Sequence, residues 1–260
     1  MKRTENLALV MISIGMLVST AFTCKKDNDH DKGPEGTYYG PVKALGNGTI
    51  RSFVVIDTYG KPQTMGLKFT EAALAGLPAD TTSEHDTPVE LPPQAGTTGF
   101  DHIEVDWNPV GHDPKPIFGA PHFDFHFYMI SKQEQASVVP GPDTFSVPAK
   151  FIPQDYHSGV IAVPDMGVHW VDVTAPEFNG QPFTDTFIYG FYHGKMTFLE
   201  PMITRDFLNK HAEYKLTIKQ PAAFQKSGYY PTVQHIEYNN GAGEFTLSLE
   251  GLSFHNSTAN

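Results

Sequence analysis

The sequence predicts a mainly β fold, a single antiparallel β-barrel or barrel-like sandwich with a few short helices. The 260 residues include 23 glycines and 21 prolines, which suit short strands separated by turns. Nineteen phenylalanines and 11 tyrosines favour half-buried strands. The sequence has no long run with helical periodicity and no internal repeat, so we expect one domain.

The N-terminus predicts a bacterial lipoprotein signal peptide over residues 1–23. Two basic residues precede an apolar run over residues 7–18, which is short for a membrane span. Cleavage would fall before Cys24, and a lipid would be attached to its sulfur. The alternative is an ordinary signal peptide with a chance cysteine. Cys24 is the only cysteine of the chain, so it has no disulfide partner, and lipid attachment accounts for it.

Residues 24–36 are expected to form a flexible acidic and polar tether, and residues 37–260 the β-barrel domain. The expected location is the cell envelope, as an outer-membrane lipoprotein on the periplasmic or the surface face. The net charge of −11 excludes nucleic acid as a partner, because such binding needs basic patches. The sequence leaves open a small ligand and a homo-oligomer.

The strands are predicted from apolar or alternating runs that end at turn-forming residues. In chain order they are expected at residues 48–56, 64–69, 100–107, 119–130, 159–163, 168–173, 185–192, 195–199, 214–219, 233–238 and 244–254. Residues 78–99 are predicted to form a polar, proline-rich loop. The glycine-containing segments 192–195 and 239–243 favour hairpin turns.

Three short helices are predicted from their capping residues. Thr70 would cap a helix over residues 71–77, and Thr204 would cap one over residues 205–209. The Ser-Lys-Gln-Glu run at residues 131–134 is a capping box that opens the third helix.

The strongest chemical signal is the run Pro-His-Phe-Asp-Phe-His-Phe-Tyr at residues 121–128. A strand has a period of two residues, so His122, Asp124 and His126 share one face and the phenylalanines share the other. Residues two apart on a strand lie roughly 6.5 Å apart. One ion can therefore be chelated by His122 with Asp124, or by Asp124 with His126. All three on one ion would need a bulge.

A single metal site would take one such pair and complete its shell from neighbouring strands. His169 and Glu200 are the best candidates, because each ends a segment whose backbone is restrained by Pro or Gly. Histidine and carboxylate ligands suit Zn²⁺, Fe²⁺ or Mn²⁺. The remaining His or Asp would orient a ligand or act as a general base.

A second strand makes the same alternation, with His102, Glu104 and Asp106 on one face. If the two strands pair, one face of the sheet gathers six ligand-capable side chains, and these three could support the ligands from behind. His112, in the connecting loop, either reaches the same region or is a plain loop residue. The face as a whole is a metal or catalytic site, a solvated surface, or a buried hydrogen-bonded network without metal.

Other catalytic constellations are excluded by the sequence. It contains no Gly-x-Ser-x-Gly nucleophile elbow, no glycine-rich phosphate loop and no dinucleotide fingerprint. His85, His157, His211, His235 and His255 lie in polar or turn-like surroundings and are predicted to be surface residues.

Four short segments form a specific set: APHFDFHFY at residues 120–128, MGVHW at 166–170, FIYG at 187–190 and EPMIT at 200–204. Together they resemble a bacterial family of unknown function that is described by a β-barrel domain. Over residues 36–220 the resemblance implies a secreted or envelope β-barrel that can form oligomers. It implies no activity.

A fainter similarity is to the cupins, in which a His-x-His pair and a later Glu and His hold a metal in a β-barrel. Here Asp124 stands in the middle position, and His169 precedes Glu200, which departs from the cupin order.

Two classes of function follow. The favoured one is a lipid-anchored binding or structural module with a His/Asp/Glu-lined polar site, because no nucleophile or substrate pocket can be named. The alternative is a cupin-like metal-dependent enzyme that activates water or oxygen.

Overall fold

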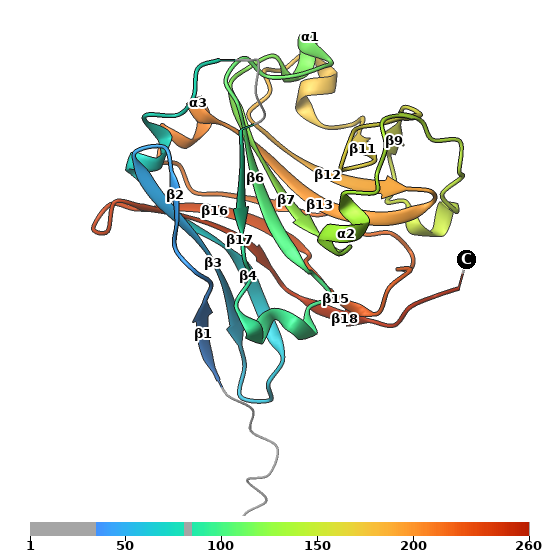
Figure 1. The fold of residues 1–260 in the computed structure, drawn as a ribbon, viewed down its shortest axis with the longest axis horizontal. Helices are drawn as coiled ribbons and strands as arrows, with labels where there is room; N and C mark the ends of the chain where they lie inside the picture. The colour runs from blue at the N-terminus through green and yellow to red at the C-terminus, as the bar shows by residue number, and fades with distance from the viewer. Residues whose placement is uncertain (1–34, 81–84, 260) are drawn as a thin grey trace, which may run out of the picture. The chain divides into compact units, whose positions relative to one another are not determined.

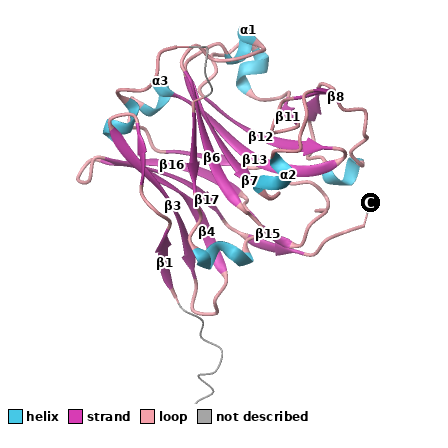
Figure 2. Cartoon of the chain, in the orientation of Figure 1, coloured by secondary structure: helices cyan, strands magenta, loops and turns pink. Residues whose placement is uncertain are grey.

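The computed structural model describes residues 35–80 and 85–259. The predicted signal peptide, Cys24 and nearly all of the predicted tether lie outside these residues. Strands dominate the described chain and its helices are short, so the predicted mainly β class is confirmed (Figure 2). No described helix has both the length and the apolar character that a membrane span requires.

The first of two large antiparallel sheets has the strand order β1-β3-β4-β17-β16-β14, with β2 paired to β3 (Figure 1). Pairing of β4 with β17 joins the two ends of the domain in one sheet. Its strands are β1 (Gly36–Tyr39), β2 (Lys43–Leu45), β3 (Gly48–Ile56), β4 (Pro62–Thr70), β14 (Tyr214–Thr217), β16 (Val233–Asn239) and β17 (Glu244–Glu250).

The second sheet has the order β5-β6-β7-β13-β12-β11-β9 and carries the candidate site. Figure 1 shows β6, β7, β13 and β12 side by side. Its strands are β5 (Asp86–Val89), β6 (His102–Asn108), β7 (His122–Tyr128), β9 (Tyr156–Ser158), β11 (Val168–Asp172), β12 (Asp185–Tyr192) and β13 (Lys195–Thr204).

Smaller elements join the strands of the two sheets. Two short ribbons pair β8 with β10 and β15 with β18. Their bounds are β8 (Gly141–Pro142), β10 (Ile161–Ala162), β15 (Gly228–Tyr230) and β18 (Ser253–His255). The helices are α1 (Lys115–Phe118), α2 (Lys132–Gln135) and α3 (Arg205–Leu208), with 3₁₀ turns η1 (Glu71–Leu74), η2 (Pro93–Thr97), η3 (Ala149–Phe151) and η4 (Pro176–Asn179).

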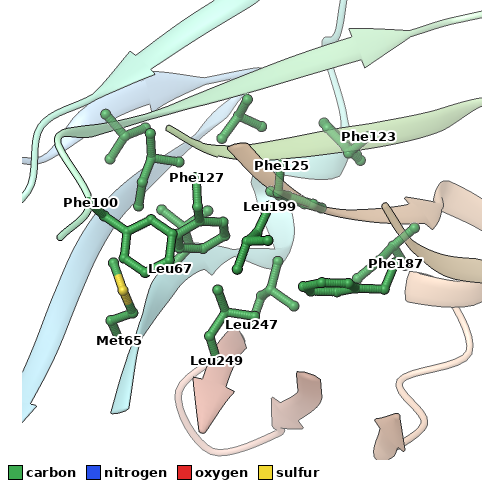
Figure 3. Packing of buried hydrophobic residues seen from close by; sticks show 14 of the residues in the cluster. Met65, Leu67, Phe100, Phe123, Phe125, Phe127, Phe187, Leu199, Leu247 and Leu249 are labelled. Atoms are coloured by element: carbon green, nitrogen blue, oxygen red, sulfur yellow. The ribbon is translucent and has the colours of Figure 1, made fainter. Parts of the chain in front are cut away.

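The main core is built from both large sheets. Phe123, Phe125 and Phe127 are each at most 1 % exposed and belong to one cluster with side chains from β4 and β17, as Figure 3 shows. The ring of Phe125 lies 6.0 Å from that of Phe69 on β4. Burial of a phenylalanine contributes roughly 1.5–3 kcal/mol. The aromatic half of the alternation therefore places the polar half on the opposite face of the second sheet.

The predicted barrel is not found among residues 35–80 and 85–259. Each large sheet runs between two edge strands, and neither closes on itself. The choice between a barrel and a sandwich therefore stays a prediction, while the antiparallel pairing is observed throughout both sheets.

Two of the predicted helix caps are confirmed. Ser131 accepts a hydrogen bond from the backbone of Glu134, whose side chain accepts one from the Ser131 backbone, as a capping box requires. Thr204 accepts from the backbone N–H of Phe207. Thr70 makes no side-chain cap to η1, which is a 3₁₀ turn shorter than the predicted helix. Its hydroxyl instead accepts a hydrogen bond from the backbone of Thr49.

Three predicted segments need correction. The expected loop over residues 78–99 contains β5 and η2, because its polar residues form an edge strand against β6. The strand expected at residues 195–199 continues to Thr204, since β13 is buried between β7 and β12. The strand expected at residues 244–254 divides into β17 and β18 around Gly251, which has a φ of 64°.

One predicted surface histidine is buried. His235 is 6 % exposed, and its Nδ1 lies 2.7 Å from Oε1 of Glu250 on the neighbouring strand. Its polar sequence surroundings concealed its position on β16, which is paired with β14 on one side and β17 on the other.

Candidate functional site

The predicted pairing of the two polar strands is present in the second sheet. In the β6–β7 register, Glu104 lies opposite His126 and Asp106 lies opposite Asp124. On the other side of β7, Met202 of β13 lies opposite Asp124. Glu200 is two residues earlier on β13, so it shares the face of His126. The expected face of ligand-capable side chains therefore exists, although its members divide into two clusters.

The first cluster consists of His112, His122 and Asp124. Asp124 Oδ1 lies 3.1 Å from His122 Nε2, and its Oδ2 lies 3.4 Å from His112 Nε2. Asn108 donates a 2.7 Å hydrogen bond to Oδ2 and fixes the carboxylate. Since His122 is fully buried and Asp124 is 5 % exposed, bulk water does not satisfy the facing atoms of these two side chains.

Backbone carbonyls orient both histidines of the first cluster. His122 Nδ1 lies 2.7 Å from the carbonyl of Ala120, and His112 Nδ1 lies 2.8 Å from that of Asp113. A carbonyl only accepts, so each Nδ1 carries the proton, and in a neutral ring each Nε2 presents its lone pair to Asp124. This is how metal-binding histidines are held in proteins.

Gly111 permits this position of His112. Its φ is +62°, and a Cβ there would lie 2.0 Å from the carbonyl oxygen of Phe118. His112 in turn donates its backbone N–H to the same carbonyl. The sequence left open whether His112 was a plain loop residue, and the turn brings it to the site.

The second cluster consists of His126, His169 and Glu200. Glu200 Oε1 lies 3.5 Å from His126 Nε2, and Oε2 lies 3.6 Å from His169 Nε2. Behind His126, the Nδ1 atom lies 2.8 Å from Oδ2 of Asp106. The carboxylate of Asp106 thus occupies the position of an orienting partner for a ligand histidine.

The ligand atoms of each cluster lie within 4.8 Å of one another, which is close enough for one metal ion. In a tetrahedral site with metal–ligand bonds of 2.0–2.1 Å, two ligand atoms are separated by about 3.3 Å. The four nitrogen–oxygen distances in the clusters are 3.1, 3.4, 3.5 and 3.6 Å. Four of these atoms, His122 Nε2, Asp124 Oδ1, His126 Nε2 and Glu200 Oε2, have no hydrogen-bond partner among the described residues. The donor atoms and their spacing therefore suit a divalent cation.

Burial and neighbouring charges shift the pKa of every member of the second cluster. Burial disfavours the charged form of His126, but Glu200 and Asp106 outweigh it and raise its pKa to about 10. Burial and the charge of His126 lower the pKa of His169 to about 3. Burial raises the pKa of Glu200 in spite of the His126 charge.

In the first cluster, Asp124 raises the pKa of His112 to about 9, although burial opposes the charged form. Burial would raise the pKa of Asp124, but the nearby charges of the two histidines hold it well below its usual range. Strong perturbation by burial and a specific charge partner is typical of functional sites.

A glycine on β12 makes room beside the second cluster. A Cβ at Gly190 would lie 2.2 Å from the ring of Phe198. That ring packs 4.8 Å from the ring of His126 and 5.1 Å from that of His169. Phe198 therefore fixes the direction of both histidines, which no sequence pattern indicated.

A cleft of about 1120 Å³ lies over the two clusters. His112, Asp124 and His169 line it, whereas His122, His126 and Glu200 are at most 1 % exposed and lie beneath them. Each cluster thus offers a more exposed histidine, and each has only three protein ligands, which leaves coordination positions for a water or a ligand.

The other expected partners surround the clusters without joining them. His102 lies 2.8 Å from the side-chain oxygen of Gln135, and Gln135 donates to Glu104. Asn108 and Gln135 were not predicted. Asn108 continues the alternation of β6, so the pattern could have indicated it, whereas Gln135 depends on where α2 packs.

The fold and the site describe a mainly β protein with two His₂–carboxylate clusters beneath a cleft. The model of the family described as TTHB210-like, "Hypothetical protein TTHB210", matches residues 57–107, which is less than half of the chain. The span covers Glu104 and Asp106 but none of the six cluster residues. No curated protein and no solved structure matches the chain. The match agrees with the expected resemblance to a family of unknown function and adds no support for secretion or a barrel.

Proposed function

We propose that the protein is a lipid-anchored envelope protein that binds one divalent metal ion at each cluster and holds a small ligand in the cleft above them. The observation that carries the proposal is the alignment of the first cluster. Two rings with backbone-bound Nδ1 atoms direct their Nε2 atoms at one buried carboxylate. Without a metal ion, a proton on Nε2 takes its place, as the raised pKa of His112 indicates, and a divalent cation would displace that proton. Zn²⁺, Fe²⁺ and Mn²⁺ match the donor set.

The second candidate function is a metal-dependent enzyme that activates water or oxygen. Two histidines and one carboxylate are the protein ligands of many catalytic zinc sites and of non-haem iron(II) oxygenases. Both clusters have this set and face the cleft. A bound metal would supply a Lewis acid there, while Asp106 would orient His126 and accept a proton. A structural site would instead be expected to have four protein ligands.

Elemental analysis of protein purified without a histidine tag tests the metal proposal. We expect about two equivalents of Zn²⁺ per chain after dialysis, one for each cluster. His112→Ala and His169→Ala should each remove about one equivalent, because each deletes the most exposed ligand of its cluster. His157→Ala is the matched control, since His157 lines the same cleft and belongs to neither cluster. Retention of both equivalents in the two variants, or equal loss in the control, refutes the proposal.

The remaining parts of the proposal concern the envelope. The core shared by the two large sheets supports a barrel-like sandwich. Anchoring through a lipidated Cys24 rests on the signal-peptide pattern and predicts that Cys24→Ser moves the protein from the outer membrane to the soluble fraction. A variant that stays with the membrane contradicts the anchor. Light scattering on the released variant measures whether the domain forms a homo-oligomer.

A further inference from the structure

The walls of the cleft carry a strong charge bias. Among the described residues that line it there is no Lys or Arg. Two divalent ions would not neutralise the carboxylates of the lining. The ammonium group of Lys115, the residue after the lining residue Pro114, donates hydrogen bonds to the carbonyl oxygens of Val110 and Gly111. The seven lining carboxylates are Asp80, Asp86, Glu104, Asp106, Asp113, Asp124 and Asp165.

Three of these carboxylates form an acidic end, which we define as Asp86, Asp106 and Asp165. Asp86 on β5 lies directly opposite Asp106 on β6. Like charges opposite each other on paired strands destabilise a sheet. Burial and the neighbouring charges, those of Asp106 and Asp165 among them, raise the pKa of Asp86 to about 6. Asp86 and Asp165 are exposed and His126 pairs with Asp106, so the acidic end keeps a net negative charge that a bound cation can offset.

A buried group at the acidic end also lacks a hydrogen-bond partner. Asp106 is 8 % exposed and lines the cleft, and its Oδ1 atom has no hydrogen-bond partner among the described residues. Its ion pair with His126 occupies one side of Oδ2. The hydroxyl of Tyr128, also a lining residue, is buried without a partner. These groups point to a ligand that donates hydrogen bonds.

Part of the cleft lining is apolar. Ile188, Val171 and Phe178 form this part, which we call the apolar wall. Ile188 on β12 pairs with Glu200 on β13, and three strand spacings, roughly 14 Å, separate β12 from β6, which carries Asp106. The path from the acidic end to the apolar wall passes over the second cluster. A ligand that fits both ends has a donor-bearing cationic head and an apolar body.

We propose that the cleft binds an organic amine, whose ammonium head lies among Asp86, Asp106 and Asp165 and whose apolar body lies on the wall formed by Ile188 and Val171. The inference rests on the proposed function for the cleft as a ligand site and names the ligand class. It does not require the metal ions, because the acidic end lies outside both clusters. An ammonium group supplies three donors and one positive charge, and it offsets the repulsion between paired carboxylates.

Isothermal titration calorimetry with three matched probes tests the inference. The probes are 4-phenylbutylamine, 4-phenylbutan-1-ol and 4-phenylbutanoate, which share a body and differ in the charge of the head. On full-length protein stripped of metal by chelation, the amine should bind at least tenfold more tightly than the alcohol. The carboxylate should bind more weakly than both. Asp86→Asn and Asp165→Asn should each reduce the amine-to-alcohol ratio at least threefold, whereas Glu237→Gln, an exposed carboxylate on β16, should leave it unchanged.

The outcomes separate this inference from the metal proposal. An amine that binds no more tightly than the alcohol overturns the inference. A proton shared between Asp86 and Asp106 would then be enough to relieve the repulsion at the acidic end. Metal uptake measured in parallel is unaffected by that result. An amine preference in a protein that takes up no metal supports the inference and refutes the metal centres. Equal losses in Glu237→Gln and in the two cleft variants also overturn it, because general charge would then account for binding.

Discussion

Replacing Asp106 by asparagine tests whether this carboxylate controls the metal affinity of the second cluster. Asp106 Oδ2 lies 2.8 Å from Nδ1 of His126, whose side chain is fully buried. Asparagine keeps the size of the side chain and removes its charge. Loss of such an orienting partner lowers metal affinity about 10–100-fold, which corresponds to about 1.4–2.7 kcal/mol. Because buried charge pairs are little screened, we expect a loss near 100-fold.

The assay is competition for Zn²⁺ against a chromophoric chelator, in a His112→Ala background that retains the second cluster alone. Asp101→Asn is the matched control, because Asp101 makes a similar contact of 2.9 Å with His102 but is largely exposed and outside both clusters. The control should change the affinity less than twofold. An affinity in Asp106→Asn within threefold of the background would refute the orienting role. Thermal unfolding of the metal-free proteins checks that the two variants are equally folded.

Three further outcomes follow from the structure. The pKa of His126 is about 10, so this histidine must lose a proton when metal binds, and Zn²⁺ affinity should rise about tenfold per pH unit between pH 6 and 8. An affinity that stays constant above pH 7, as for an ordinary histidine, contradicts this. In chemical denaturation, Gly190→Ala should lower the free energy of unfolding by about 1–3 kcal/mol, because the added methyl group displaces Phe198, and it should also weaken metal binding. The control Gly96→Ala should leave the free energy of unfolding unchanged, because the space around Gly96 is open. Phe125→Ala should cost about 3–5 kcal/mol in the same assay, and a loss below 1 kcal/mol contradicts its place in the shared core.

Local sequence patterns predicted several elements of the second sheet and its connections correctly. Residues 185–192 were predicted with the bounds that β12 has, and the capping box at Ser131 is present. The alternation over residues 121–128 correctly separates a core face from a polar face. Fully buried β13 carries little alternation, so the sequence ended that strand too early and placed Glu200 at a strand end. Polar edge strands such as β5 resemble loops in composition, and this concealed Asp86 at the rim of the cleft.

The division of the ligands depends on contacts between distant segments. His126 on β7 contacts Glu200 on the neighbouring strand β13, and His169 lies on β11, which is two strands beyond β13. His112 reaches Asp124 only because a loop with a left-handed glycine turns back over the sheet. Strand order and loop direction are set by the packing of the whole domain, and no local spacing encodes them.

By itself the sequence determined the mainly β class and the identity of the ligand-capable face, because both follow from the two-residue period of a strand. The spacing of residues on a strand also indicated that His122, Asp124 and His126 would need a bulge to bind one ion together. The tertiary structure decided which side chains meet: it assigns His122 and Asp124 to one cluster and His126 to another. The physical reason is that ligand atoms must approach within a few ångströms, and only the pairing of β6, β7 and β13 and the folded loop at His112 bring them that close.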